Sequence, residues 1–388
     1  MATERRRRFL VGAGALVAGA WAPAATAACL HQPGATFAAT WEQEGRHFVG
    51  VLAATHDGVE TLVRHEVPTR AHGIAVEPQG TILLVARRPG DWLLRFDPRR
   101  GEVLDWDWGD GGFVCNGHVL HSGDGRRLFT TETSLETGEG SIGVREARGL
   151  AVVARWPTGG IDPHELVLGP DGALWVANGG IEIRPETGRT KHGVARMDSS
   201  LVRLDPVSGR LGGQWRLDDR RLGLRHVAVA RDGTIGFALQ AEHDDDPARQ
   251  AAPVLALWDR RQGLRPVPLP PGILLAGYGG SVARLGAGFA VSCPRANQVV
   301  RWDLAGGEAR WQAPVRLREA CPIAAGWLGG AGAIAHWGTV AAARLPAGQT
   351  ARAEAAGGSA IERLPLDDAI RLDNHWALMN DADVAARA

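Results

Sequence analysis

Five histidines recur at equivalent places along the chain, and each is followed by a short apolar run. They are His72, His118, His164, His226 and His375. Imidazole is the commonest side-chain ligand for copper, zinc and iron, and several rings that converge on one point can hold such an ion. We therefore expect a shared ligand-binding site at these histidines, with a copper or iron ion as the expected occupant.

A structural role is the alternative for any one of these histidines. A ring at the start of a strand can hydrogen-bond the backbone of the neighbouring repeat and bind no ligand. The histidines occupy five of seven equivalent positions, although the chain has only 13 histidines in 388 residues. This concentration favours a common site.

The histidines mark a repeat of four short strands. In the first unit the sequence predicts strands at 72–76, 81–87, 92–96 and 102–106, separated by turns rich in Gly, Pro and Asp. Asp-Gly recurs in the first turn of later units, where it supplies the positive φ of a short hairpin. Two units, at 281–285 and 322–325, carry the apolar run without a histidine. The repeat therefore has seven units.

Repeated antiparallel sheets of four strands are typical of a β-propeller. A linear solenoid is the alternative, but it needs polar capping units at both ends. The strand at 375–379 has no partners after it, whereas strands at 37–41, 47–53 and 60–67 have no innermost strand before them. We therefore predict an all-β fold, a seven-bladed β-propeller of four-stranded antiparallel blades, closed by pairing the C-terminal strand with the N-terminal strands.

The long insertions and the histidines are expected on one face of the propeller. Three units are lengthened between their second and third strands, at 133–141, 179–200 and 241–253. In a propeller these loops emerge on the same face as the loops that lead into the innermost strands. Because binding residues concentrate in elaborated loops, we expect the site at the channel mouth on this face.

Further polar residues are predicted at the rim of this mouth. They are Glu132, Asn178 and Gln240 at equivalent ends of second strands, Glu165 beside His164, and Asn116 close to His118. Oxygen atoms of Glu132, Asn178 and Asn116 suggest a different occupant, a calcium ion, as in calcium-dependent lactonases of propeller fold. Four arginines near the same rim could recognise an anionic ligand, namely Arg87, Arg88, Arg184 and Arg295. Loop caps and solvated charges are the alternatives for these residues.

The composition indicates one globular domain behind an export signal. The chain has no formal net charge, so no basic surface for nucleic acid is implied. Residues 1–27 combine Arg5-Arg6-Arg7-Arg8, a short apolar run and Ala25-Thr26-Ala27, which resembles a twin-arginine signal peptide. The apolar run is too short to span a bilayer. We expect a signal peptide at 1–27, one propeller domain at 28–388 in the periplasm, and no transmembrane segment in the mature chain.

The four cysteines are far apart and form no metal-binding pair. Cys29 follows the predicted cleavage region and could carry a lipid anchor, but Thr26 stands where a lipobox usually has leucine, so a soluble periplasmic protein is favoured. An oxidising compartment would permit a disulfide between Cys293 and Cys321, which the sequence alone does not decide.

Several segments resemble the DUF1513 family of exported bacterial proteins. They are the leader, His72-Gly73-Ile74-Ala75, Asn116-Gly117-His118, and the stretches 131–144 and 162–181. The resemblance covers essentially the whole mature chain and implies a propeller of undefined biochemistry. Members of the family are often encoded beside imelysin-type iron-uptake proteins and dihaem peroxidase-like proteins. The resemblance therefore implies these proteins as partners, and a periplasmic role in the acquisition of iron or another metal.

The sequence thus predicts a periplasmic propeller that binds a metal ion or small ligand at a histidine-lined channel mouth, accessory to iron or metal acquisition. An enzyme is the second hypothesis, either a metal-dependent, lactonase-like hydrolase or an oxidoreductase. A scaffold that docks partner proteins on the elaborated face is the third. The histidine pattern favours binding over catalysis, and no catalytic residue is identified.

Overall fold

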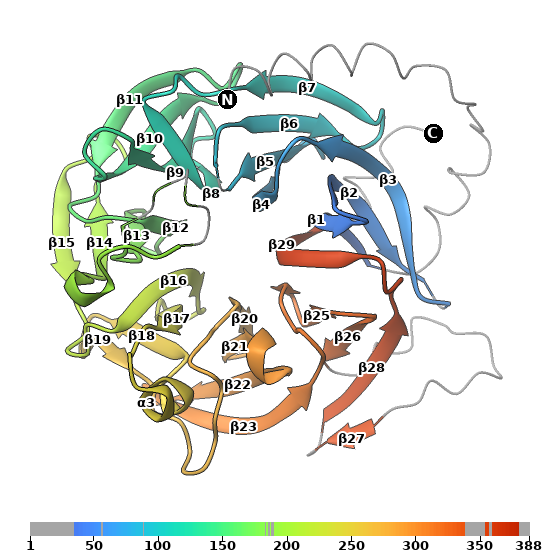
Figure 1. Cartoon of the computed structure of the whole chain (residues 1–388), viewed down its shortest axis with the longest axis vertical. Coiled ribbons are helices and arrows are strands. Elements are labelled where there is room, and N and C mark those ends of the chain that lie inside the picture. The colour runs from blue at the N-terminus through green and yellow to red at the C-terminus, as the bar shows by residue number, and fades with distance from the viewer. Residues whose placement is uncertain are drawn as a thin grey trace.

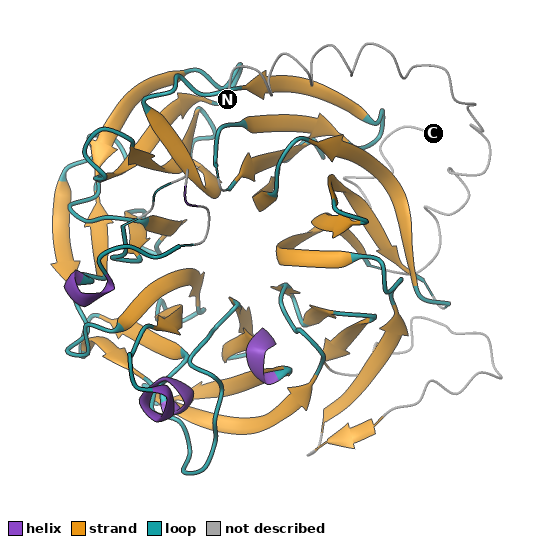
Figure 2. Ribbon diagram, in the orientation of Figure 1, coloured by secondary structure: helices purple, strands orange, loops and turns teal. Residues whose placement is uncertain are grey.

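Short strands account for more than half of the described residues in a computed structural model (Figure 2). The structure describes residues 35–337, except 56, 88, 183, 185, 186, 188 and 189, together with 354–356 and 359–379. The predicted signal peptide at 1–27, Cys29 and Arg88 lie outside the described residues. Three short helices have their bounds within the described residues, namely η2 (Val194–Arg196), α3 (Asp246–Ala251) and η3 (Pro294–Ala296). None of these is long and apolar enough to cross a bilayer.

The strands form seven antiparallel sheets, arranged as blades around a central axis (Figure 1). Blade 1 contains β29 (Arg371–Met379), β1 (Thr36–Gln43), β2 (Arg46–Ala54) and β3 (Val59–Val67). Blade 2 contains β4 (Ala71–Val76), β5 (Ile82–Ala86), β6 (Leu93–Asp97) and β7 (Glu102–Asp107). Blade 3 contains β8 (Phe113–His121), β9 (Arg127–Ser134), β10 (Gly140–Glu146) and β11 (Val152–Pro157). Blade 4 contains β12 (Pro163–Leu168), β13 (Leu174–Asn178), β14 (Ser200–Leu204) and β15 (Leu211–Trp215).

The remaining three blades follow the same order. Blade 5 contains β16 (Leu222–Val229), β17 (Ile235–Ala241), β18 (Leu255–Asp259) and β19 (Gly263–Pro266). Blade 6 contains β20 (Ser281–Leu285), β21 (Gly288–Cys293), β22 (Gln298–Ala305) and β23 (Glu308–Arg316). Blade 7 contains β24 (Ile323–Ala324), β25 (Trp327–Gly330), β26 (Ala333–Trp337), β28 (Ser359–Pro365) and a fifth strand, β27 (Glu354–Ala356). The predicted seven-bladed propeller is confirmed.

The two ends of the described chain meet in blade 1. β29 pairs antiparallel with β1, placing Met379 opposite Thr36 and Trp376 opposite Ala39 (Figure 1). The Thr36 hydroxyl group also donates a hydrogen bond of 3.3 Å to the Met379 carbonyl oxygen. The predicted closure is therefore confirmed, and it removes the open sheet edges that a linear stack would leave.

A hydrophobic cluster fills each of the seven interfaces between neighbouring blades. β5 shows why the inner strands read as continuous apolar runs. Ile82 and Leu84 pack toward blade 1, whereas Leu83 and Val85 pack toward blade 3. A strand that is buried on both faces has no polar alternation, and each buried leucine contributes about 1.5–3 kcal/mol. This packing fixes the positions of the innermost strands.

Candidate metal centre

The five predicted histidines all lie at β-bulges in the innermost strands. In β4, the residues on either side of His72 pair with consecutive residues of β5, which leaves His72 as the extra residue. Corresponding shifts span His118, His164, His226 and His375. β20 and β24, the innermost strands without a histidine, pair with their neighbours without a shift. A bulge bends its strand and re-aims the local side chain. These bulges therefore explain why the rings point away from the blade faces and toward one another.

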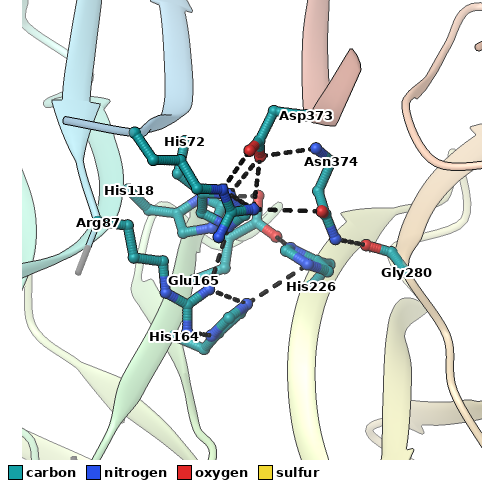
Figure 3. Close-up of polar contacts among 10 residues, drawn as sticks. His72, Arg87, His118, His164, Glu165, His226, Gly280, Asp373 and Asn374 are labelled. Carbon is teal, nitrogen blue, oxygen red and sulfur yellow. Dashed lines mark hydrogen bonds and ion pairs between the residues drawn. The ribbon is translucent and has the colours of Figure 1, made fainter. Parts of the chain in front are cut away.

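The five rings meet in one buried cluster on the propeller axis. Among the ring pairs in contact, centroids lie between 4.4 Å apart, for His226 and His375, and 6.0 Å apart, for His72 and His164. His72 is 1% exposed, and His118, His164 and His226 are also buried. Figure 3 shows these four rings gathered between strands of different blades. Five segments that are distant in the sequence thus contribute one polar cluster to the channel.

Two glycines allow blades 2 and 3 to approach closely enough for this contact. A Cβ atom on Gly73 would lie 2.1 Å from the Gly117 carbonyl oxygen. A Cβ atom on Gly117 would lie 2.8 Å from Cδ2 of His72, and the φ angle of Gly117 is +102°. Glycine is the residue that tolerates both the positive φ and the close backbone approach.

Carboxylates hold the Nδ1 atoms of three of the histidines. Nδ1 of His72 lies 2.7 Å from Oδ1 of Asp373 (Figure 3). The two oxygens of Glu165 lie 3.1 Å from Nδ1 of His226 and 3.5 Å from Nδ1 of His118. A carboxylate that accepts the Nδ1–H bond fixes the tautomer in which Nε2 carries a lone pair. This is the arrangement by which proteins orient histidines toward a metal ion.

Four of the rings offer nitrogen atoms close to one point. One ring nitrogen from each of His72, His118, His226 and His375 lies within 4.8 Å of the others. Among the described residues, none hydrogen-bonds the buried Nε2 of His118 or of His375. Burying such an atom without a partner is unfavourable. A tetrahedral ion with metal–nitrogen bonds of 2.0–2.1 Å needs nitrogens about 3.4 Å apart, so binding would draw the rings slightly inward.

The fifth histidine, His164, lies between this set and an arginine. Arg87 places Nη1 3.3 Å from Nε2 of His164 and 3.1 Å from Nε2 of His72. Nη2 of Arg87 is 3.0 Å from Nδ1 of His164, whose Nε2 is 3.4 Å from Nε2 of His226. His164 therefore bridges Arg87 and the four-histidine set.

Burial keeps the imidazoles neutral. The first cause of the shift at every ring is loss of hydration, and nearby arginines and other imidazoles add to it. The pKa is lowered well below its usual value in His72, His118, His164 and His226, and to about 4 in His375. Burial also raises the pKa of Glu165 to about 8, against a lowering effect of the Val227 N–H group. Neutral imidazole is the form that binds a metal.

A cavity of about 270 Å³ opens onto the cluster. His72, His164 and His226 form part of its lining. Ile181, Glu182, Thr190 and Lys191, which come from the insertion between β13 and β14, form another part. The insertion at 179–200 therefore lies at the histidine mouth, on the face where the sequence placed it.

The other predicted rim residues divide into two groups. Glu165 belongs to the cluster, and Gln240 lines the cavity while donating a 2.6 Å hydrogen bond to Glu242. Asn116 instead bonds Thr133 and the Pro163 carbonyl oxygen in the interface between blades. Asn178 bonds the Thr158 carbonyl oxygen and the Ser200 hydroxyl group. The structure does not bring Asn116 and Asn178 to the histidines.

Glu132 also lies away from the cluster, in a closed ion network of blade 3. Its carboxylate accepts hydrogen bonds of 2.8 Å from Arg145 and 2.9 Å from Arg155. Gly143 lies between them, where a Cβ atom would be 2.2 Å from Oε1 of Glu132. Both oxygens of Glu132 are thus engaged by arginines, and it shares no cation site with Asn178. The histidine set is the one group of converging ligands found among the described His, Cys, Asp and Glu residues.

Cys293 and Cys321 carry free thiols, as Cys115 does, so no disulfide joins Cys293 to Cys321 in the structure.

The predicted rim arginines do not all lie at the cavity. Arg87 and Arg295 line the cavity, whereas Arg184 is exposed and pairs with Glu182.

Asp373 and Arg70 were missed by sequence reasoning. Each lies two residues before a histidine of the cluster, and Arg70 donates a bidentate pair of hydrogen bonds to Asp373. Asn116 and Asp162 hold the same position before His118 and His164. A polar residue two positions before the histidine is therefore the signal that could have pointed to Asp373.

Comparisons with known proteins give a family and distant structural likenesses. A nidogen/laminin complex matches at 14% identity and a TM-score of 0.45, over 72% of this chain and 93% of that chain. A PQQ-bound aldose sugar dehydrogenase from Streptomyces coelicolor matches at 15% identity and a TM-score of 0.39, over 76% and 94% of the two chains. The Dos1 propeller matches at 13% identity and a TM-score of 0.48, over 75% and 74%. No curated protein matches the chain. The model of a protein family of unknown function, DUF1513, matches residues 65–379.

Proposed function

The chain belongs to the DUF1513 family, for which no function is described, and we propose that this member binds one transition-metal ion through four imidazoles. The ligands are His72, His118, His226 and His375. The observation that carries the proposal is the orientation of the rings. Asp373 and Glu165 lie against the Nδ1 atoms of His72, His118 and His226. The buried Nε2 atoms of His118 and His375 lack hydrogen-bond partners among the described residues.

The donor set supports copper first, with zinc and iron as the competing ions. Four neutral nitrogens suit copper, zinc and iron, and affinity for a nitrogen site rises toward Cu²⁺ in the divalent series. Calcium prefers six to eight oxygen ligands. Glu132, the oxygen ligand expected of a calcium-dependent hydrolase, is engaged by Arg145 and Arg155. The site therefore supports binding of a transition metal better than lactonase-like hydrolysis.

Copper titration of the purified, metal-free protein tests the proposal. We expect one Cu²⁺ per chain, with hyperfine coupling from several nitrogens in its electron paramagnetic resonance spectrum. His118→Gln and His226→Gln should each lower copper affinity at least 100-fold, because each removes one ligand of a buried set. Zn²⁺ and Fe²⁺ titrations under the same conditions rank the metals.

His47→Gln is the matched control, because His47 belongs to β2 and lies outside the four-histidine set. It should leave copper affinity unchanged. A metal site in the cluster would be contradicted if the protein bound none of the three ions stoichiometrically. It would also be contradicted if the His118 and His226 variants bound copper as tightly as the wild-type protein.

We also propose, from the sequence, that the protein acts in the periplasm as an accessory to iron or metal acquisition, with imelysin-type and dihaem peroxidase-like proteins as partners. The leader Arg6-Arg7-Arg8-Phe9-Leu10 and the family resemblance support this. Cell fractionation should recover the mature protein in the periplasm. Replacing Arg6, Arg7 and Arg8 with lysine should retain the precursor in the cytoplasm, and unchanged export would contradict the twin-arginine route.

A further inference from the structure

Arg87 competes with a metal ion for the same lone pair. Its Nη1 lies 3.1 Å from Nε2 of His72, on the side of the ring opposite Asp373 (Figure 3). Because Nδ1 of His72 donates to Asp373, the lone pair is on Nε2, where a guanidinium group can donate to it. One lone pair serves either the arginine or the metal. Metal binding to His72 therefore requires Arg87 to give up this contact.

The charge of Arg87 stays beside the site after that contact is lost. Arginine does not lose its proton in proteins, and the side chain is buried, with 4% of its surface exposed. Its contacts with His164, from Nη1 to Nε2 at 3.3 Å and from Nη2 to Nδ1 at 3.0 Å, hold the group near the cluster. A guanidinium cation and a divalent ion then face each other in a poorly hydrated cavity, where like charges repel strongly.

The cavity above the cluster is rich in positive charge. Its lining contains five cationic side chains, Arg70, Arg87, Lys191, Arg225 and Arg295, and two carboxylates, Asp162 and Glu182. Arg70, Lys191 and Arg225 pair with Asp373, Glu242 and Asp162. Arg295 lies over the Tyr278 ring, 4.3 Å from its centroid. With those three cations paired, Arg87 and Arg295 leave the cavity wall with a small excess of positive charge.

We propose that the cavity binds a small oxyanion together with the metal ion, with the anion bridging the metal and the Arg87 guanidinium. The inference rests on the proposed metal site and specifies its second ligand. A negative group between the two cations relieves their repulsion, and the planar fork of arginine matches the paired oxygens of a carboxylate, carbonate or phosphate. The volume of about 270 Å³ lies below the usual range of drug-sized pockets, which limits the anion to a small molecule.

The dependence of copper affinity on added anions tests this inference. Copper affinity of the whole protein is measured in a non-coordinating buffer with perchlorate as the only anion, and free copper is set by a competing chelator. Acetate, bicarbonate or phosphate is then added in separate arms. We expect at least one anion to raise the affinity of the wild-type protein tenfold or more. The three arms distinguish a carboxylate, a carbonate and a phosphate ligand.

Arg87→Gln separates this role from a structural one. The variant should lose the anion effect and bind copper more tightly than the wild-type protein without anions, because the competing cation is gone. A merely misfolded site would instead bind more weakly in every arm. Arg260→Gln, which removes the same charge from an exposed residue of a different cavity, should behave as the wild-type protein.

The outcomes keep the two proposals distinct. Copper binding that is equally tight with and without every anion overturns the oxyanion site and leaves the metal site standing. An anion effect that persists in Arg87→Gln overturns the assignment of Arg87. No copper binding in any arm overturns copper as the ion of the site. The wild-type measurement decides the first and last of these even if the Arg87 variant does not fold.

Discussion

Glu77, which is buried, and Glu165, whose side chain is 19% exposed, show opposite ways of placing a carboxyl group inside this propeller. Burial raises the pKa of Glu77, but hydrogen bonds from His121, Arg95 and Thr81 outweigh it and lower the pKa to about 2. The Arg95 contacts are 2.7 and 3.1 Å long, and Thr81 donates at 2.6 Å. Glu77 therefore carries a fully compensated charge.

Glu165 has no comparable compensation. Burial raises its pKa to about 8, and the Val227 N–H group opposes this only in part. Its other neighbours are Nδ1 atoms of His118 and His226, which are neutral rings. Among the described residues no arginine or lysine bonds Glu165, whereas Arg95 bonds Glu77. A metal ion held by those two rings would place a positive charge next to the Glu165 carboxyl group.

Glu132 belongs with Glu77 and not with Glu165. Its partners Arg145 and Arg155 are bonded to both carboxylate oxygens, and Arg145 is 3% exposed. The comparison therefore separates closed carboxylate–arginine networks, which stabilise blades, from the open histidine cluster, which has bonding capacity left for a ligand.

The largest expected effect is on a closed network. Glu132→Gln removes the buried carboxylate that pairs with Arg145, which keeps its ion pair with Asp107. Breaking a buried pair of this kind lowers the free energy of unfolding by about 3–5 kcal/mol. Copper affinity should not change, because Glu132 contacts none of the cluster histidines. Urea unfolding and copper titration of the same preparation measure both quantities.

Glu146→Gln is the control for this prediction. Glu146 is 57% exposed and lies 3.9 Å from Arg127, so its loss should change the free energy of unfolding by no more than about 1 kcal/mol. If Glu132→Gln stayed folded but lost copper binding, the Glu132 network would take part in metal binding, and its separation from the histidine cluster would be wrong.

Acid should weaken the second closed network. The pKa of Glu77 is lowered on folding from 4.5 to about 2, so its contribution is complete above pH 4.5 and is lost as the pH falls toward 2. The shift corresponds to about 3 kcal/mol. Urea unfolding at pH 7, 4.5 and 3 should show a constant difference between wild-type protein and Glu77→Gln above pH 4.5 and a smaller difference at pH 3. A difference independent of pH would show that the Glu77 charge is not compensated as described.

Substitutions in the histidine cluster should lower copper affinity and change the free energy of unfolding much less. Glu165→Gln removes the carboxyl group that orients His118 and His226, and loss of such an orienting group lowers metal affinity by roughly 10–100-fold. Glu182→Gln makes the same substitution at a residue that lines the cavity beside the cluster but bonds Arg184 and none of the cluster histidines, so it should keep wild-type copper affinity. Isothermal titration with copper compares the two variants, and equal affinities would remove Glu165 from the site.

The closed and open regions also differ in how far the sequence predicted them. The propeller followed from local signals, because strands of five or six residues and Asp-Gly turns repeat in phase. The convergence of five histidines then followed from that phase. The bulges at His72 and the other four histidines could not be predicted, because a register shift depends on pairing between strands that no single segment specifies.

The partners of each carboxylate were the least predictable feature. Glu132 was placed at the rim because it ends a second strand as Asn178 does, yet Arg145 and Arg155 on the next two strands of its own blade engage it across Gly143. Asp373 was overlooked although it contacts His72, since the two are 301 residues apart. Contacts of this kind depend on register within a blade and on closure of the ring.

The smallest expected effect concerns the backbone that positions the open cluster. Gly117 and Gly111 both have positive φ, at +102° and +84°, but only at Gly117 would a Cβ atom meet His72, whereas Gly111 has open space around it. Gly117→Ala and Gly111→Ala therefore share the backbone strain, and the first adds a steric clash of about 1 kcal/mol beyond it. Copper affinity should fall only in Gly117→Ala, because displacement of His72 moves a ligand while the closed networks stay intact. If both variants lose the same stability and bind copper as the wild-type protein does, the close approach of β4 and β8 is a packing feature of blades 2 and 3 and does not position the metal ligands.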